Sequence, residues 1–331
     1  MKLKLNLKKI STVTIAASML LLAGCSSGGS SSSTSGSSSG FNPSSSFNGG
    51  SDALSFSFEK SAPPEKIRDQ GMETFAVRLL IKNEGEADIA ENTGYVSLAG
   101  IDKSVYNLVE SSKFIPQLDG YKVQGSNTLD GRFQYVIFSN LKYSGEVLGS
   151  TTERLIANIC YPYQTRASTN LCVSGDTSSY VDEDLKICDL EGNRNVASSG
   201  GPLSVENVKQ YPSGASKITF QFDIVHNPKQ ATSTLYESGS IGPNCKIHGE
   251  LPTSSNSRAR QNKVIFDVTT GINGLDCGND NSVTLYDNRA TVICSQDTSG
   301  LEEFEKPIKI TLDYEYFDRI STDITIEHLQ R

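Results

Sequence analysis

Six cysteines are the side chains best suited to covalent chemistry in the body of this 331-residue chain. They are Cys160, Cys172, Cys188, Cys245, Cys277 and Cys294. None of them has the C-x-x-C spacing that is typical of zinc sites and thiol oxidoreductases. An even number of cysteines in an exported chain predicts up to three structural disulfides. The spacing favours Cys277–Cys294, because the turns between these two residues bring two strand ends together.

The remaining pairings stay open at this stage. Cys172 fits either Cys160 or Cys188, since Thr165–Ser168 is predicted to form a hairpin turn. Cys245 is expected in a bridge that joins two domains. Each disulfide is expected to contribute about 2–4 kcal/mol, chiefly by restricting the unfolded chain.

Oxygen-bearing side chains gather around one predicted turn. They are Asp276, Asn279, Asp280, Asn281 and Asp287. Because Ca²⁺ prefers such ligands, this turn is a candidate calcium site, and no other cofactor is expected. The spacing differs from that of an EF-hand, and Asn and Asp are also frequent in turns because they bond to their own backbone. The sequence is compatible with two interpretations of this segment, a structural Ca²⁺ site and a turn that binds no metal.

Motifs for nucleophilic catalysis find little support. Gly36–Gly40 matches the pattern G-x-S-x-G, but no strand precedes it and no helix follows it, so the nucleophile elbow cannot form. His226 and His328 continue the periodicity of predicted strands, which favours structural roles over catalytic ones. The third histidine is His248. We therefore expect no enzymatic activity. An extracytoplasmic hydrolase or carbohydrate-active enzyme is the alternative, because triads depend on geometry and not on order.

Alternating apolar and polar residues predict the strands that position these groups. The clearest ranges are Leu54–Phe58, Glu73–Asn83, Lys217–Ile224, Val264–Val268 and Ile308–Tyr314. Further candidates are Tyr95–Ile101, Phe133–Phe138, Arg154–Tyr163, Ser282–Tyr286, Ala290–Cys294 and Ile320–Ile326. Such alternation puts one face on a core and the other in water, as in antiparallel sheets. The only helical candidates are Ser104–Lys113 and a single turn at Leu301–Lys306.

Many short strands separated by turns indicate an all-β fold, with two Ig-like antiparallel β-sandwich domains. The first is expected at 52–190 and the second at 203–331, with a polar linker at 191–202. Tyr161, Tyr163, Tyr314, Tyr316 and Phe317 fit cross-strand packing or an exposed interface.

The N-terminus has the features of an export signal. Four lysines precede a mostly apolar run, Ile10–Leu22, which is too short to cross a bilayer as a helix. Leu22-Ala23-Gly24-Cys25 resembles the lipobox of prokaryotic lipoproteins. The resemblance implies a lipid on Cys25 and removal of residues 1–24. An ordinary signal peptide or an uncleaved anchor is the alternative.

Residues 25–51 contain the lipidated Cys and a Ser/Gly-rich segment, which is expected to be a flexible tether. The protein is thus expected on the outside of the cell membrane or outer membrane. The whole chain has 30 basic and 38 acidic residues, and loss of the four N-terminal lysines leaves 26 basic residues. This acidic balance argues against nucleic acid as a partner.

The segment Phe75–Gly100, with its turn Lys82–Asp88 between two strands, resembles CARDB-type Ig-like modules of prokaryotic surface proteins. The resemblance covers about residues 52–110 and supplies no functional residues. It implies a noncatalytic adhesion or scaffold role in the cell envelope, with a protein or glycan partner. A surface receptor that captures a small ligand is a further alternative.

Overall fold

A computed structural model of the chain describes residues 47–124, 127–177, 186–247, 259–278 and 280–328. All of them belong to one unit, Gly40–Arg331, as grouped by internal contacts. The predicted signal peptide, Cys25 and most of the tether lie outside the described residues. The described part is built from antiparallel sheets, which confirms the all-β sandwich class.

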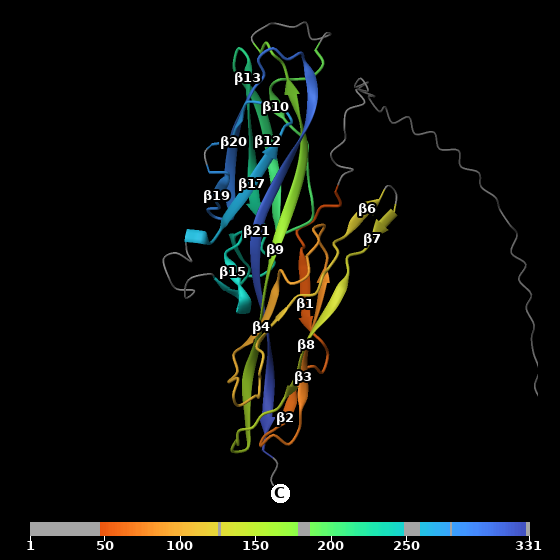
Figure 1. The fold of residues 1–331 in the computed structure, drawn as a ribbon, viewed down its shortest axis with the longest axis vertical. Helices are drawn as coiled ribbons and strands as arrows, with labels where there is room; N and C mark the ends of the chain where they lie inside the picture. The colour runs from red at the N-terminus through yellow and green to blue at the C-terminus, as the bar shows by residue number, and fades with distance from the viewer. Residues whose placement is uncertain (1–46, 125–126, 178–185, 248–258, 279, 329–331) are drawn as a thin grey trace, which may run out of the picture. The chain divides into compact units, whose positions relative to one another are not determined.

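Two long strands form the centre of this unit. β9 (Ser150–Val173) and β21 (Phe304–Glu327) each have 24 residues and pair antiparallel from end to end. They run side by side in Figure 1. The two predicted strands Ile308–Tyr314 and Ile320–Ile326 are therefore parts of one strand.

The predicted turn at Thr165–Ser168 is wrong, because these residues lie inside β9. Thr165 is fully buried. Its hydroxyl lies 2.8 Å from the hydroxyl of Tyr314 and 3.3 Å from the carbonyl oxygen of Leu203. A buried hydroxyl with two partners is compatible with a strand interior.

β9 and β21 belong to a nine-stranded sheet with the main order β19-β17-β21-β9-β4-β5. β11 pairs with β9, and both β2 and β14 pair with β21. The bounds are β2 (Lys66–Arg68), β4 (Tyr95–Ala99), β5 (Ser112–Phe114), β11 (Val196–Ser198), β14 (Thr234–Glu237), β17 (Lys263–Thr269) and β19 (Ser282–Thr284).

A five-stranded sheet packs on one part of this large sheet and forms what we call the β13 sandwich. Its order is β10-β12-β13-β20-β18. The bounds are β10 (Gly192–Asn193), β12 (Leu203–Gly214), β13 (Lys217–His226), β18 (Leu275–Asp276) and β20 (Arg289–Asp297). Phe222 of β13 meets Phe266 of β17 edge to face, with ring centroids 6.4 Å apart.

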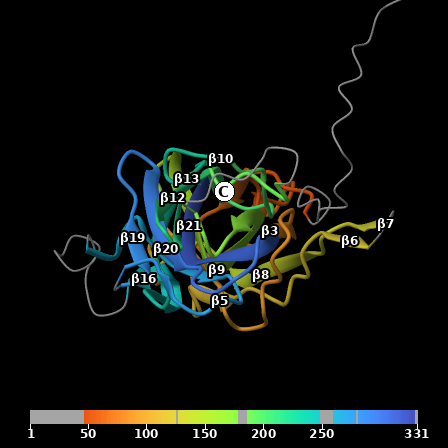
Figure 2. The ribbon, with the colours of Figure 1, turned by 90° about the horizontal axis from the view of Figure 1, so that it is seen from above.

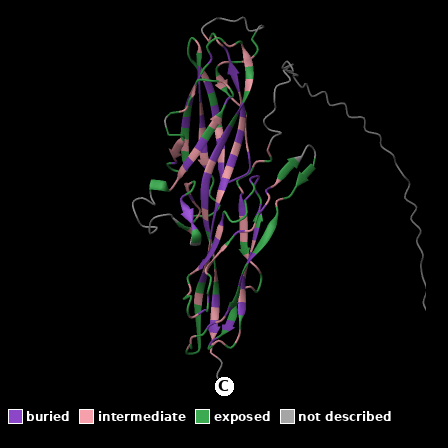
Figure 3. Ribbon diagram, viewed as in Figure 1, coloured by how far each residue is buried: buried purple, intermediate pink, exposed green. Residues whose placement is uncertain are grey.

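A three-stranded sheet packs on another part and forms the β3 sandwich. Its order is β1 (Leu54–Phe58), β3 (Phe75–Asn83) and β8 (Phe133–Leu141). The odd-numbered residues of β3 are buried, as the alternation predicted. Figure 3 shows the buried residues alternating along these strands and along β9 and β21.

Three short elements complete the described structure. They are the hairpin β6 (Lys122–Gln124) with β7 (Asn127–Leu129), the pair β15 (Ile241–Gly242) with β16 (Lys246–Ile247), and the 3-10 helix η3 (Pro243–Cys245). The β6–β7 hairpin extends away from the sheets in both ribbon views (Figure 1, Figure 2). The predicted helix at Ser104–Lys113 is wrong. Its residues form turns and the start of β5, with Tyr106 and Leu108 in the core.

Four tyrosines from the two long strands pack against one another on the buried face of β9 and β21. Tyr161 and Tyr163 lie directly opposite Tyr316 and Tyr314, with ring centroids 5.9 and 6.0 Å apart. All four side chains are buried. Cross-strand packing, and not an exposed interface, is therefore their role.

The structure contains three disulfides. Cys277–Cys294 and Cys172–Cys188 confirm two of the predicted pairs. Cys160 and Cys172 cannot pair, because both lie on β9 and twelve residues of strand separate them by about 40 Å. Cys160 instead bonds to Cys245 in η3, a bridge between the ranges 52–190 and 203–331.

The expected linker at 191–202 forms part of two sheets, the five-stranded sheet and the nine-stranded sheet. It supplies β10 and β11, and it ends in the buried stretch 199–202. β9 and β21, which come from the two expected domains, share one sheet. The division into separately folding ranges 52–190 and 203–331 stays a prediction.

Candidate binding surface

β8 is the edge strand of the three-stranded sheet. Only β3 pairs with it among the strands that the structure describes. Its sequence, Phe-Gln-Tyr-Val-Ile-Phe-Ser-Asn-Leu, contains no charged residue and no proline. Natural edge strands are usually short, charged or interrupted by proline, because an open edge pairs readily with other strands. The segment Phe133–Phe138 has none of these protections, whereas the register of β8 shifts at Ser139–Asn140, where the side-chain amide of Asn107 donates to the carbonyl oxygen of Asn140 at 3.3 Å.

One face of β8 presents apolar side chains to solvent. Phe133, Tyr135 and Ile137 are 59%, 36% and 40% exposed, whereas Val136 and Phe138 point into the core. The rings of Phe133 and Tyr135 meet edge to face, with centroids 6.3 Å apart. We call these three side chains, together with the unpaired side of β8, the β8 edge.

Three ion pairs lie near the β8 edge. The guanidinium of Arg78 lies 5.0 Å from the centroid of the Tyr135 ring and also bonds to Glu59. The ion pairs around the edge are Arg78–Glu59 at 2.9 Å, Lys82–Glu84 at 3.8 Å and Arg132–Asp119 at 2.9 Å. Such exposed pairs add little stability. They do balance the charges of Arg78, Lys82 and Arg132 in an acidic protein.

A groove of about 650 Å³ lies beside the β6–β7 hairpin, which leads into β8. The residues that line it are Phe47, Glu86, Ala87, Asp88, Tyr121, Lys122, Val123, Gln164 and Arg166. Most of these side chains are polar or charged. The groove therefore offers hydrogen-bond donors and acceptors beside the aromatic ring of Tyr121.

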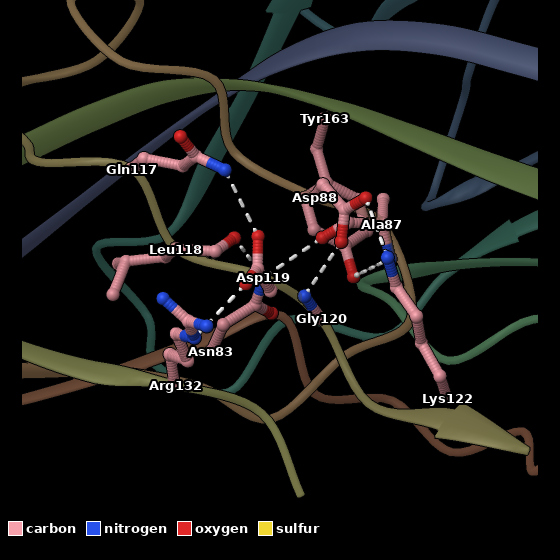
Figure 4. Close-up of polar contacts among 10 residues, drawn as sticks. All are labelled: Asn83, Ala87, Asp88, Gln117, Leu118, Asp119, Gly120, Lys122, Arg132 and Tyr163. Atoms are coloured by element: carbon pink, nitrogen blue, oxygen red, sulfur yellow. Dashed lines mark hydrogen bonds and ion pairs between the residues drawn. The ribbon is translucent and has the colours of Figure 1, made fainter. Parts of the chain in front are cut away.

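Asp88 is held firmly at the wall of this groove. Its carboxylate accepts a hydrogen bond from the backbone N–H of Gly120 at 2.8 Å and pairs with Lys122 Nζ at 2.9 Å (Figure 4). Partial burial acts to raise the pKa of Asp88, but the contacts with Gly120 and Lys122 outweigh it and lower that pKa. The carboxylate is therefore charged at neutral pH.

The turn that carries Gly120 is fixed by side-chain amides. Asn83, which is fully buried, donates to the carbonyl oxygens of Ala87 and Leu118 at 2.8 and 3.2 Å. Gln117 donates to Asp119 at 3.0 Å, and Asp119 also pairs with Arg132 (Figure 4). These contacts tie the groove wall to the start of β8.

Two further charged residues face the groove. The buried carboxylate of Glu86 accepts hydrogen bonds from the backbone N–H groups of Asn48, Gly49 and Gly200. The guanidinium of Arg166 has no ion-pair partner in the described part of the chain. Glu86 is thus occupied by the protein itself, whereas Arg166 is available to a bound molecule.

The predicted calcium turn does not assemble a carboxylate cluster in the described residues. Asn279 lies outside them, and Asp276 accepts a hydrogen bond from the backbone N–H of Gly278 at 2.9 Å. Among His, Cys, Asp and Glu side chains in the described ranges, only Cys172, Cys188 and Glu303 bring three potential metal-ligand atoms together. The two sulfurs of this group form a disulfide. Calcium at this turn stays a prediction.

Two of the three histidines lie at strand ends, as their periodicity indicated. Nε2 of His226 lies 3.3 Å from the hydroxyl of Tyr316, and burial lowers the pKa of this histidine. Nδ1 of His328 lies 2.7 Å from Oδ2 of the buried Asp69, and this bond holds the pKa of Asp69 below its usual value. His248 lies outside the described residues. The expectation that the protein is not an enzyme stays a prediction.

No protein-family model matches the chain, and no curated protein matches it. In the described part of the chain, no helix is both long and apolar enough to cross a membrane. The sequence predicted a strand at Phe133–Phe138 but not its place at a sheet edge. The signal that was present is a run of nine residues without charge or proline.

Proposed function

We propose that this protein is a lipid-anchored, extracytoplasmic component of the cell envelope that acts as a noncatalytic adhesion or scaffold module. Its contact surface is the β8 edge. The observation that carries the proposal is a nine-residue edge strand without charge or proline. Three side chains of this strand are apolar and exposed. An open edge of this kind binds an extended segment by adding a strand to its sheet.

The disulfides and the N-terminal sequence support the proposed location. Three disulfides are typical of proteins that fold in an oxidising compartment. The basic start, the short apolar run and the lipobox-like Leu22–Cys25 support export and lipidation. Two acyl chains anchor a protein stably where a single chain is marginal.

A site-specific photo-crosslinker at the β8 edge tests the contact surface. We would replace Tyr135 in the full chain with a photoreactive phenylalanine analogue and irradiate intact native cells. The matched control is Tyr286, which is 78% exposed and lies in a turn of the β13 sandwich. Adducts at position 135 and none at 286 are expected. Surface-displayed protein without any adduct at 135 would contradict the proposal.

The anchor is tested separately with Cys25→Ser. Metabolic labelling with an alkyne fatty acid should mark the wild-type chain and not the variant. Label that persists in Cys25→Ser would show that the lipid is elsewhere or that the lipobox resemblance is fortuitous.

A ligand-capturing receptor is the second candidate function, and the unpaired guanidinium of Arg166 in the groove favours it. A polar glycan fits such a groove, because carbohydrates need both donors and acceptors beside an aromatic ring. Binding on a glycan array that Arg166→Ala abolishes and Arg289→Ala preserves would support this receptor. If no glycan on the array binds the protein, the result would contradict the proposal of a glycan receptor.

A further inference from the structure

We infer that two copies of this chain associate through β8, which pairs antiparallel with the β8 of the second copy. The two three-stranded sheets then join into one sheet of six strands. This inference rests on the proposed function, since it names the partner that the β8 edge takes.

The open edge is the first reason. β8 is the longest described strand that pairs on one side only, with nine residues against five in β1 and two or three in β5, β10, β18 and β19. A longer edge offers more main-chain hydrogen bonds to an incoming strand. A single hydrogen bond is weak after exchange with water, so length decides whether the contact persists.

Self-complementarity is the second reason. Around a twofold axis at Tyr135, an antiparallel strand places Tyr135 opposite the same residue of the partner and Phe133 opposite Ile137. This register pairs all three exposed apolar side chains with one another. Aromatic residues opposite β-branched ones are favourable cross-strand pairs.

Charge is the third reason. A charged residue near the centre of β8 would meet its own like charge across the axis, and β8 has none. The whole chain has a net charge of −8, which opposes contact between copies in general. Near the β8 edge, Arg78, Lys82 and Arg132 each pair with an acidic residue, so these neighbours add no net charge to that repulsion.

Exposure of apolar side chains alone does not select this surface. Ile293 on β20 is 56% exposed, more than Ile137, and β18 pairs with β20 only at Ser295 and Gln296. The two isoleucines therefore provide a matched pair of exposed positions. Their strands differ in charge, because β20 carries Arg289 and Asp297 whereas β8 carries no charged residue.

The test is sedimentation equilibrium of the full lipidated protein in a density-matched detergent. Wild type and Ile293→Lys should be dimers, whereas Ile137→Lys should weaken the dimer more than tenfold in its dissociation constant. At a protein concentration low enough for both variants to be monomeric, thermal unfolding of Ile137→Lys should match that of Ile293→Lys, which excludes misfolding as the cause. A monomeric wild type, or a dimer that Ile137→Lys leaves intact, would overturn the inference.

A second measurement traps the contact on cells. Tyr135→Cys should form an intermolecular disulfide under mild oxidation, because paired Cα atoms of antiparallel strands lie about 4.5–5.5 Å apart. Tyr286→Cys should not. If Tyr135→Cys yields no disulfide-linked dimer while the photo-crosslinker at 135 captures another macromolecule, the second copy is the wrong partner and the proposed function stands. If both fail, the proposed function fails as well.

Discussion

The β13 sandwich and the β3 sandwich share the strands β9 and β21 but protect their edges differently. In the β13 sandwich, β12 pairs with β10 over only two residues, so much of its outer side lacks a partner strand. β12 carries Glu206, Lys209 and Pro212, which discourage further pairing. β8 in the β3 sandwich has an open edge and no such residue. Two regions with the same architecture thus differ in the chemistry of one edge, and the proposed contact surface rests on that difference.

We expect the largest loss of stability from removing the disulfide Cys160–Cys245, which joins the ranges 52–190 and 203–331. Replacing Cys160 and Cys245 together by Ser should destabilise the fold by about 4–5 kcal/mol, because the loop between them spans 85 residues. The same change at Cys172 and Cys188, 16 residues apart, should cost about 3 kcal/mol. Urea unfolding of both double variants measures the difference. Equal losses would contradict the loop-length argument.

We expect the cores of the β13 sandwich and the β3 sandwich to lose similar amounts of stability when one buried aromatic ring is removed from each. Phe222→Ala in the β13 sandwich and Phe138→Ala in the β3 sandwich should each cost about 3–5 kcal/mol, since both rings are fully buried. Calorimetry of the two variants makes this comparison. A loss near zero for Phe138→Ala would show that the β3 sandwich is loosely packed, and the contrast would then extend beyond the edges.

Acid should weaken the β3 sandwich through Asp69, which joins the end of β21 to the segment after β2. The hydrogen bond from His328 lowers the pKa of Asp69. The carboxylate therefore stabilises the fold above its unfolded pKa of about 4, and this stability is lost as the pH falls through the lower folded value. Melting curves of wild type and Asp69→Asn should differ at pH 6, and the difference should shrink as the pH falls below the usual pKa of a carboxyl group. A difference independent of pH would contradict this assignment.

The smallest effect on the isolated fold is expected at the edges themselves. Ile137→Lys and Ile293→Lys should each change the free energy of unfolding of the monomer by less than about 0.5 kcal/mol, because both side chains are exposed. Urea unfolding at low protein concentration measures both values. A large loss for Ile137→Lys alone would assign this residue to the core of the sandwich instead of the contact surface.

Removing the protective residues of β12 tests whether they prevent that edge from pairing with another strand. Replacing Glu206, Lys209 and Pro212 of β12 by Val should raise self-association of the protein, because these residues protect a partly open edge. Sedimentation velocity against concentration detects the change. Unaltered behaviour would mean that another feature covers β12.

Local patterns predicted most strands because alternation needs only one buried face. Phe75–Ile81 in β3 and Ile218–Ile224 in β13 bury every second residue as expected. The pattern failed at Thr165–Ser168, where a polar stretch runs through the interior of β9. Buried hydroxyls there have partners from other strands, and no local sequence signal announces those partners.

Three properties can be read from the amino-acid sequence alone: the strand-forming segments, the even set of cysteines in the body of the chain, and the uncharged run of β8. These properties follow from side-chain chemistry and from periodicity along the chain. Three others emerge only in the folded protein: β9 and β21 run through both sandwiches, Cys160 meets Cys245, and β8 lies at an edge. Each of these depends on contacts between residues far apart in the chain, which the composition and spacing of a segment do not specify.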